Sequence, residues 1–109
     1  MKLVKFLVTW LICVIPVGTT AADSVLMFSA DWCGYCQVAK KDMMEHKEEV
    51  IPWMLEIVDV DTSRDMARDY KVKSMPTFVY LNSKGEEVDR LVGYTGYDKL
   101  SQWVKKNKR

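Results

Sequence analysis

Side chains that bind metal ions are scarce in this chain of 109 residues, which has one histidine, His46, and three cysteines. A structural zinc site needs about four such ligands, and a small secreted domain stapled by disulfides carries several cysteine pairs. Neither sign of charge is in excess, because 16 Lys and Arg side chains are balanced by 15 Asp and Glu side chains. These shortages argue against a zinc domain, a disulfide scaffold and the clustered basic surface of a nucleic-acid-binding protein.

Long hydrophobic runs are missing except at the N-terminus. Lys2 and Lys5 precede an apolar run over residues 6–17, and mostly small side chains follow as far as Ala22. The run is about 12 residues long, which is shorter than the ~20 that a membrane-spanning helix needs. A positively charged N-terminal region, a short apolar run and small residues before a cleavage site together predict a secretory signal peptide over residues 1–22, cleaved after Ala22. An uncleaved membrane anchor is the alternative interpretation.

The remaining residues, 23–109, suffice for one domain and keep two cysteines, Cys33 and Cys36. Export places such a domain in an oxidising space, where a disulfide persists. The expected location is the bacterial periplasm.

Apolar patterns in residues 23–109 predict four strands and three helices. The strands are expected at 24–29, 54–60, 77–81 and 87–92, and the helices at 33–49, 63–70 and 97–106. The first two strands are expected to be buried. Strands joined through a helix imply parallel pairing with right-handed crossovers, and a hairpin at Gly85 adds an antiparallel edge. The prediction is a three-layer α/β/α fold around a mixed four-stranded sheet, in the order β-α-β-α-β-β-α.

Helix faces and ends are predicted from the same patterns. Met43 and Met44 are expected to lie toward the core from the first helix, which Pro52 stops or kinks. Leu100, Trp103 and Val104 are expected to face inward from the last helix.

The two cysteines enclose Gly34 and Tyr35, follow a predicted strand and open a predicted helix. The N-terminus of a helix presents unpaired amide groups and about +0.5 charge, which stabilise a thiolate. The spacing lets the two sulfurs bond, and Gly34 is expected to let the chain turn tightly. The pattern predicts a redox-active disulfide in which Cys33 exchanges with a substrate and Cys36 resolves the mixed disulfide. A structural disulfide and a zinc site are the alternatives.

Residues 30–36, Ala-Asp-Trp-Cys-Gly-Tyr-Cys, resemble the active-site signature of the thioredoxin family, and residues 74–77, Ser-Met-Pro-Thr, resemble its cis-proline loop. The resemblance implies a thioredoxin-like domain over residues 23–109, with Pro76 in the cis form and packed against the cysteine pair. It also implies that the Met75 backbone binds an extended substrate and that Trp32 shields the site, with core packing as the alternative for Trp32. The implied substrate-binding residues are Trp32, Gly34, Tyr35, Met75, Pro76, Thr77 and Gly93, of which Gly93 leaves room for substrate.

Departures from the family pattern are concentrated beneath the cysteines. The buried aspartate of the first strand, a proton relay in the family, is replaced by Met27, and its lysine partner by the apolar Ile57. Tyr35 stands where reducing thioredoxins have proline, and the Cys-Gly-Tyr-Cys sequence resembles bacterial disulfide isomerases. Their dimerisation domain and the first strand and helix of full thioredoxins have no counterpart here, so a minimal monomeric member is expected.

The function that the resemblance implies is thiol–disulfide exchange with protein substrates, with the Cys33–Cys36 disulfide as the only redox group and no metal or other cofactor. The direction of exchange stays open, and a membrane electron donor is a possible further partner. Two other functions are consistent with the sequence. One is a peptide-binding module without redox turnover, and the other is an electron carrier dedicated to one membrane partner.

Overall fold

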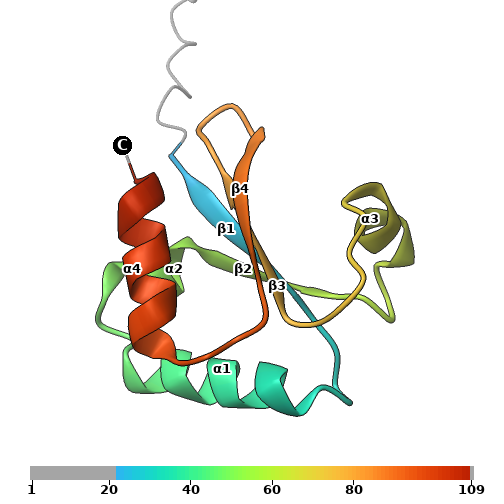
Figure 1. Ribbon diagram of the computed structural model, residues 1–109, viewed down its shortest axis with the longest axis horizontal. Coiled ribbons are helices and arrows are strands. Elements are labelled where there is room, and N and C mark those ends of the chain that lie inside the picture. The colour runs from blue at the N-terminus through green and yellow to red at the C-terminus, as the bar shows by residue number, and fades with distance from the viewer. Residues whose placement is uncertain (1–21, 109) are drawn as a thin grey trace, which may run out of the picture.

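The computed structural model describes residues 22–108, so the predicted signal peptide lies outside the described residues except for Ala22. The described chain forms the predicted α/β fold with a mixed four-stranded sheet (Figure 1). In chain order the elements are β1 (Ser24–Ser29), α1 (Gly34–Glu45), α2 (Val50–Met54), β2 (Leu55–Asp59), α3 (Arg64–Asp69), β3 (Thr77–Leu81), β4 (Glu87–Val92) and α4 (Tyr97–Asn107).

The strand order is β2-β1-β3-β4, and only β1 and β2 are parallel. The parallel pairing expected for the third strand is therefore wrong, because β3 runs antiparallel to β1. The six residues of α3 rise only about 9 Å, whereas the five residues of β2 span about 17 Å. α3 alone does not return the chain to the start of β2, and the segment 70–76 that follows it leads into β3 at the end where β2 stops. Thr77 consequently pairs with Phe28, near the end of β1 that leads to the cysteines.

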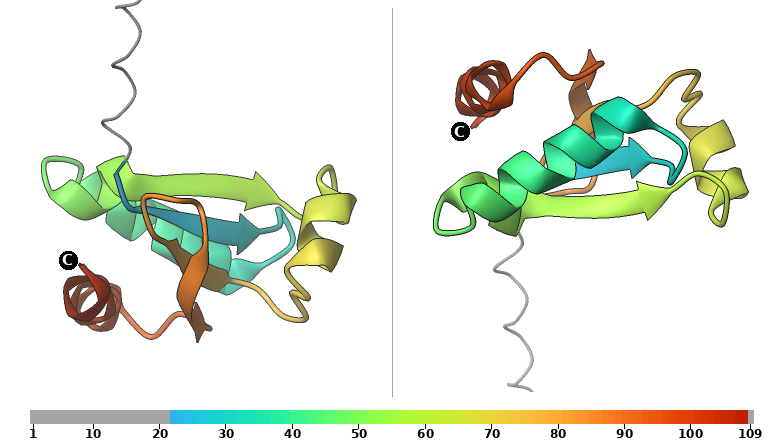
Figure 2. Two further views of the ribbon diagram at one scale, coloured as in Figure 1. Left: turned by 90° about the horizontal axis from the view of Figure 1, so that it is seen from above. Right: turned by 90° about the horizontal axis from the view of Figure 1, so that it is seen from below.

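β1 occupies the centre of the sheet, and five of its six residues are buried. Its side chains alternate between the two faces, as in any strand. Val25 and Met27 belong to a core shared with α1, α2 and α4, whereas Leu26 and Phe28 belong to a second core against α3. Figure 2 shows α1 lying across the sheet and α3 at the end where β2 stops. Helices therefore cover both faces, as predicted.

The helix predicted over 33–49 is shorter in the structure, and a separate short helix, α2, follows it from Val50. α1 ends at Glu45, and Pro52 lies in the first turn of α2, where the missing N–H removes no helical hydrogen bond. Met43 is buried as predicted, but Met44 is 69% exposed, because the buried stripe of α1 follows a spacing of three and four residues that excludes it.

Two further expectations concern the outer elements. β2 is an edge strand with Glu56 and Ile57 exposed, so the prediction of a second buried strand is wrong. The inward-facing residues of α4 are as predicted, namely Leu100, Trp103 and Val104. No helix within residues 22–108 is long and apolar enough to cross a membrane.

Asp89 joins the last strand to the last helix. One oxygen of its carboxylate accepts hydrogen bonds from Trp103 Nε1 at 2.9 Å and Asn107 Nδ2 at 3.0 Å, and Lys106 Nζ lies 3.7 Å away. These contacts, the hydrogen bond from Asn107 above all, hold the pKa of Asp89 below its ordinary value of 3.8. The folded state therefore favours the ionised carboxylate, which holds α4 against β4.

We predict that Asp89→Ala lowers the free energy of unfolding at pH 7 by about 1–3 kcal/mol, since buried donors lose their acceptor. A lowered folded-state pKa adds stability above the unfolded pKa of about 3.9, and this contribution is lost as the pH falls below it. Urea titrations at pH 7 and pH 3 should show a smaller difference between variant and wild type at pH 3. Asp65→Ala, which removes an exposed ion pair with Arg68, is the control and should cost less than about 0.5 kcal/mol. An equal loss for Asp89→Ala at both pH values would contradict the prediction.

Candidate functional site at the start of α1

Cys33 is the N-cap residue of α1, directly after the loop that leaves β1. Its backbone N–H donates to Ala30 O at 3.1 Å, which fixes the turn between strand and helix. The Cys36 backbone N–H donates to Cys33 Sγ at 3.1 Å. The first turn of α1 contains no acidic residue, so no carboxylate opposes the positive end of the helix. This environment stabilises negative charge on the Cys33 sulfur.

Cys33 and Cys36 form a disulfide, with their Cα atoms 5.2 Å apart. Cys33 is 7% exposed, whereas Cys36 is completely buried in the core between the sheet, α1 and α4. Only the Cys33 side of the bond can be reached from solvent, and it is the sulfur that the helix amide contacts. The structure thus separates an accessible sulfur, on Cys33, from a shielded one, on Cys36.

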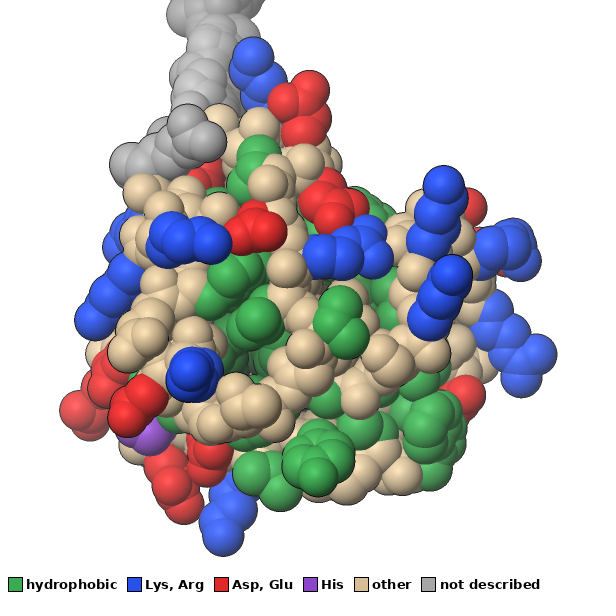
Figure 3. Space-filling model, in the orientation of Figure 1, with side chains coloured by type: hydrophobic (Ala, Val, Ile, Leu, Met, Phe, Trp, Pro, Cys, Tyr) green, Lys and Arg blue, Asp and Glu red, His purple; other side chains and the backbone are tan. Residues whose placement is uncertain are grey.

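Two aromatic residues next to the cysteines are exposed. Trp32 is 67% exposed and its Nε1 donates to Asp61 Oδ2 at 3.0 Å, so core packing is the wrong interpretation of this residue. Tyr35 is 69% exposed. Apolar side chains gather on the lower side of the molecule in Figure 3, over α1. An apolar rim therefore borders the accessible sulfur.

The loop before β3 is brought to the same end of the sheet by the antiparallel pairing of β3 with β1. The peptide bond between Met75 and Pro76 is cis, as the resemblance implied, and Pro76 is buried. Thr77 Oγ1 donates to Ser74 O at 2.7 Å and so closes the loop. Met75 packs against the core that contains both cysteines. Within residues 22–108 the Met75 backbone makes no hydrogen bond, so its amide and carbonyl are open to a ligand.

The glycines of the predicted site differ in what they do. Gly93 has a φ of +91°, and its N–H donates to Pro76 O at 2.8 Å, which joins residues distant in the sequence. A Cβ at Gly93 would meet no atom within 4 Å, so the space beside it is open. Gly34 is the first residue of α1 and lacks a positive φ, so the prediction that it permits a tight turn is wrong. Any residue of good helix propensity fits the backbone there.

Met27 and Ile57, the two apolar replacements, are partners in the register of β1 and β2. Paired residues on neighbouring strands point to the same face, and Met27 lies in the core that contains Cys36. Met27 is completely buried, whereas Ile57 is 48% exposed at the sheet edge. The floor beneath the cysteines therefore carries neither a carboxylate nor an ammonium group at these positions.

Two polar pairs that the sequence analysis did not single out join α1 and the N-cap of α2 to the segment around the start of α4. The Tyr94 hydroxyl donates to Asp42 Oδ2, and the Tyr97 hydroxyl donates to Glu49 Oε1 at 2.9 Å. Burial, followed by these hydrogen bonds, raises the pKa of Tyr94 and raises the pKa of Tyr97 to about 12. Both hydroxyls consequently stay protonated and act as donors. Among the described residues no group of three or more His, Cys, Asp or Glu side chains could hold a metal ion.

Comparison with known proteins agrees with this geometry. The sequence matches a family model described as a thioredoxin-like domain over residues 17–108, a match that begins inside the predicted signal peptide. Thioredoxin from Mycoplasma pneumoniae is 35% identical over 80 residues, which cover 73% of this chain and 78% of that protein. An H-type thioredoxin from Fagopyrum esculentum is 42% identical over 69 residues, but the match spans only 59% of its length and 63% of this chain.

Solved structures show the same likeness. The crystal structure of Schistosoma mansoni thioredoxin has a TM-score of 0.69 and 31% identity, covering 82% of this chain and 80% of the other. The structure of Fasciola hepatica thioredoxin has a TM-score of 0.67 and 38% identity, covering 81% of this chain and 83% of the other.

We predict that Met27→Asp lowers the free energy of unfolding by several kcal/mol, of the order of 3, because a carboxyl group is buried without a partner. Adding Ile57→Lys on the paired strand should recover at least about 1 kcal/mol, since an opposite charge then faces the carboxylate. Chemical unfolding of both single variants and the double variant gives the coupling energy. The matched control is Met27→Asn with Ile57→Lys, which is polar but lacks the negative charge and should show little coupling. Equal coupling in the two cycles would contradict the prediction.

Proposed function

This chain belongs to the thioredoxin-like family, and from that membership we propose that it exchanges disulfides with protein substrates through Cys33 and Cys36. The observation that carries the proposal is the disulfide at the first turn of α1, with one sulfur accessible and contacted by a helix amide and the other buried. Relatives named as thioredoxins match the chain over this segment and the Pro76 loop.

The exchange follows from which sulfur can be reached. In the oxidised protein a substrate thiolate attacks Cys33 Sγ, the Cys33–Cys36 bond breaks, and Cys36 leaves as a thiolate. A second substrate thiolate then attacks the substrate sulfur of the mixed disulfide and expels Cys33. The substrate gains a disulfide and loses two electrons, which reduce the cysteine pair. Running the same steps backwards reduces a substrate disulfide, with Cys33 as nucleophile and Cys36 as resolving thiol.

Stabilisation of the Cys33 thiolate serves both directions. The Cys36 amide and the positive end of α1 favour charge on this sulfur, so it is a good nucleophile when reduced and a good leaving group from the mixed disulfide. The direction taken depends on the potential of the pair relative to its partner, about −270 mV for thioredoxin and about −120 mV for a strong disulfide donor. Titration against glutathione measures it directly.

Substrate binding is proposed at the rim formed by Trp32, Tyr35 and the Pro76 loop. An extended segment of the substrate would pair with the Met75 amide and carbonyl, as an added strand does at a sheet edge. The exposed rings of Trp32 and Tyr35 would cover apolar side chains next to the substrate cysteine. The open space beside Gly93 leaves room for the substrate backbone. The protein is proposed to act as a monomer.

An exported compartment, the bacterial periplasm, is the proposed place of action. The proposal is supported by the charged start, the short apolar run over residues 6–17 and the small residues up to Ala22. Disulfides form and persist in such an oxidising space, so substrates for exchange are present there.

We expect Cys33→Ser to reduce turnover in an insulin-reduction assay driven by dithiothreitol by about a thousandfold or more, because the exchanging sulfur is lost. Cys36→Ser should instead accumulate a covalent mixed disulfide with the substrate, visible by non-reducing electrophoresis. The control is Ser83→Ala, an exposed position in the turn between β3 and β4, which should retain activity. A wild-type protein that bound substrate peptides but never turned over would show a binding module instead of an oxidoreductase.

Expression of the full chain in a bacterium should yield a periplasmic product whose N-terminal residue is Asp23. Osmotic-shock fractionation and mass spectrometry measure the location and the N-terminus. Ala22→Tyr is the matched change, since a bulky residue before the cleaved bond should block processing and leave the chain at full length. A full-length wild-type product in the membrane fraction would support the anchor interpretation, and one in the cytoplasm would refute export.

A further inference from the structure

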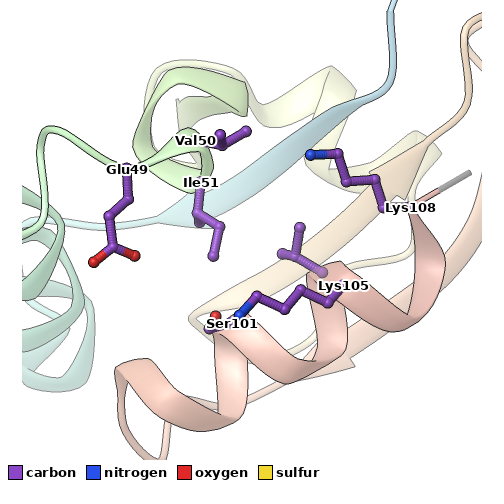
Figure 4. A pocket seen from close by; sticks show the side chains of 7 residues that line it. Glu49, Val50, Ile51, Ser101, Lys105 and Lys108 are labelled. Carbon is purple, nitrogen blue, oxygen red and sulfur yellow. The ribbon is translucent and has the colours of Figure 1, made fainter.

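An apolar hollow of about 310 Å³ lies between α2 and the second half of α4, and neither Cys33 nor Cys36 lines it. Figure 4 shows its lining side chains converging from the two helices. Val50, Ile51 and Val104 are its apolar lining residues, and Lys105 and Lys108 extend along its α4 side. The lining residues are Glu49, Val50, Ile51, Ser101, Val104, Lys105 and Lys108.

The outer side of α2 continues this apolar surface. Val50 is 54% exposed and Trp53 is 80% exposed, and the two are three residues apart on one side of the helix. Trp53 Nε1 donates to Lys47 O at 3.0 Å, so the polar atom of the ring is satisfied within the protein while the ring itself faces outward. Exposed tryptophan beside lysine is the composition found where proteins meet the interface of a bilayer.

The hollow is lined by two lysines, Lys105 and Lys108, and one carboxylate, Glu49, so positive charge is in excess there. Lys106 lies 3.7 Å from Asp89, but within residues 22–108 neither Lys105 nor Lys108 forms an ion pair. Glu49, at the opposite side of the hollow, is engaged by the Tyr97 hydroxyl. Lys105 and Lys108 are thus free to attract an anionic partner, and the hollow between the helices accepts apolar groups.

The chain enters the fold beside this same end of α4. Asp23 Oδ2 accepts a hydrogen bond from the Tyr80 hydroxyl at 2.8 Å, and the Tyr80 ring contacts the Trp103 ring with centroids 5.9 Å apart. Figure 1 shows the start of β1 near the C-terminal end of α4. The apolar run over residues 6–17 is separated from Asp23 by residues 18–22, a stretch that reaches at most about 20 Å.

We propose that the α2–α4 face, defined as Val50, Trp53, Lys105, Lys108 and the hollow between them, docks on an anionic lipid bilayer. The two lysines attract lipid phosphates, while Val50 and Trp53 enter the apolar boundary beneath the headgroups. Until cleavage after Ala22, the apolar run tethered within about 20 Å holds this face at the membrane, and after cleavage the lysines, Val50 and Trp53 bind it alone. The cysteines follow the opposite end of β1, six residues or about 20 Å further on, so they face away from the lipid.

The test uses the full chain and vesicles of phosphatidylcholine with or without phosphatidylglycerol. Lys105→Gln with Lys108→Gln should weaken binding to the anionic vesicles about tenfold or more, since each lysine near the surface contributes roughly a fivefold attraction. The matched control is Lys71→Gln with Lys73→Gln, which removes the same charge from exposed positions after α3 and should change binding less than about twofold. Equal effects of the two double variants would overturn the proposal.

A second measurement removes the contribution of the N-terminal run to binding. In anionic vesicles with brominated acyl chains, wild-type fluorescence should be quenched more than that of Trp53→Phe, because only the wild type places this indole in the lipid. Equal quenching of the two proteins would overturn the docking surface even if the full chain binds vesicles. Cys33→Ser should bind as the wild type does, so loss of redox activity and loss of docking are distinguishable outcomes.

Discussion

The junction between β1 and α1 is the constraint on which the rest of the site depends. β1 is buried on both faces, so the point at which the chain leaves the sheet is held in place. The hydrogen bond from the Cys33 N–H to Ala30 O then starts α1 directly from that point. As a result the Cys33 sulfur accepts a hydrogen bond from the Cys36 amide, one of the free amides in the first turn of the helix, where charge is stabilised. The same burial shields Cys36, so one short segment creates two unequal sulfurs.

The floor of the site is apolar at the two positions where the family has a proton relay and its lysine partner. Met27 and Ile57 supply no charged group, although their paired register would bring such groups together. Tyr94 is buried nearby in the same core, but its raised pKa keeps it a hydrogen-bond donor to Asp42. Neither Met27 nor Ile57 can therefore pass a proton to Cys36 when the disulfide opens.

The molecule has two functional ends in the proposals made above. The carboxyl end of β1 carries the cysteines, the exposed aromatic rim and the Pro76 loop, which the antiparallel β3 brings alongside. The other end carries the start of the described chain, the last turn of α4 and the hollow against α2. A bilayer on the second end leaves the first end facing substrates, since the length of β1 separates them.

Local features could be predicted from the sequence because they depend on residues a few positions apart. These include the cysteine pair at a helix start, β3 and β4 with their hairpin, the inward side of α4 and, by resemblance, the cis Pro76. The antiparallel direction of β3, the edge position of β2 and the exposure of Met44 and Trp32 were decided only in the tertiary structure. Each depends on where distant segments meet: the segment 70–76 after α3 leads into β3 at the end where β2 stops, and Asp61, 29 residues from Trp32, holds the indole outward. Residue types determined the chemistry available, whereas sheet assembly determined which groups came together, because contacts between distant residues exist only once the strands have paired.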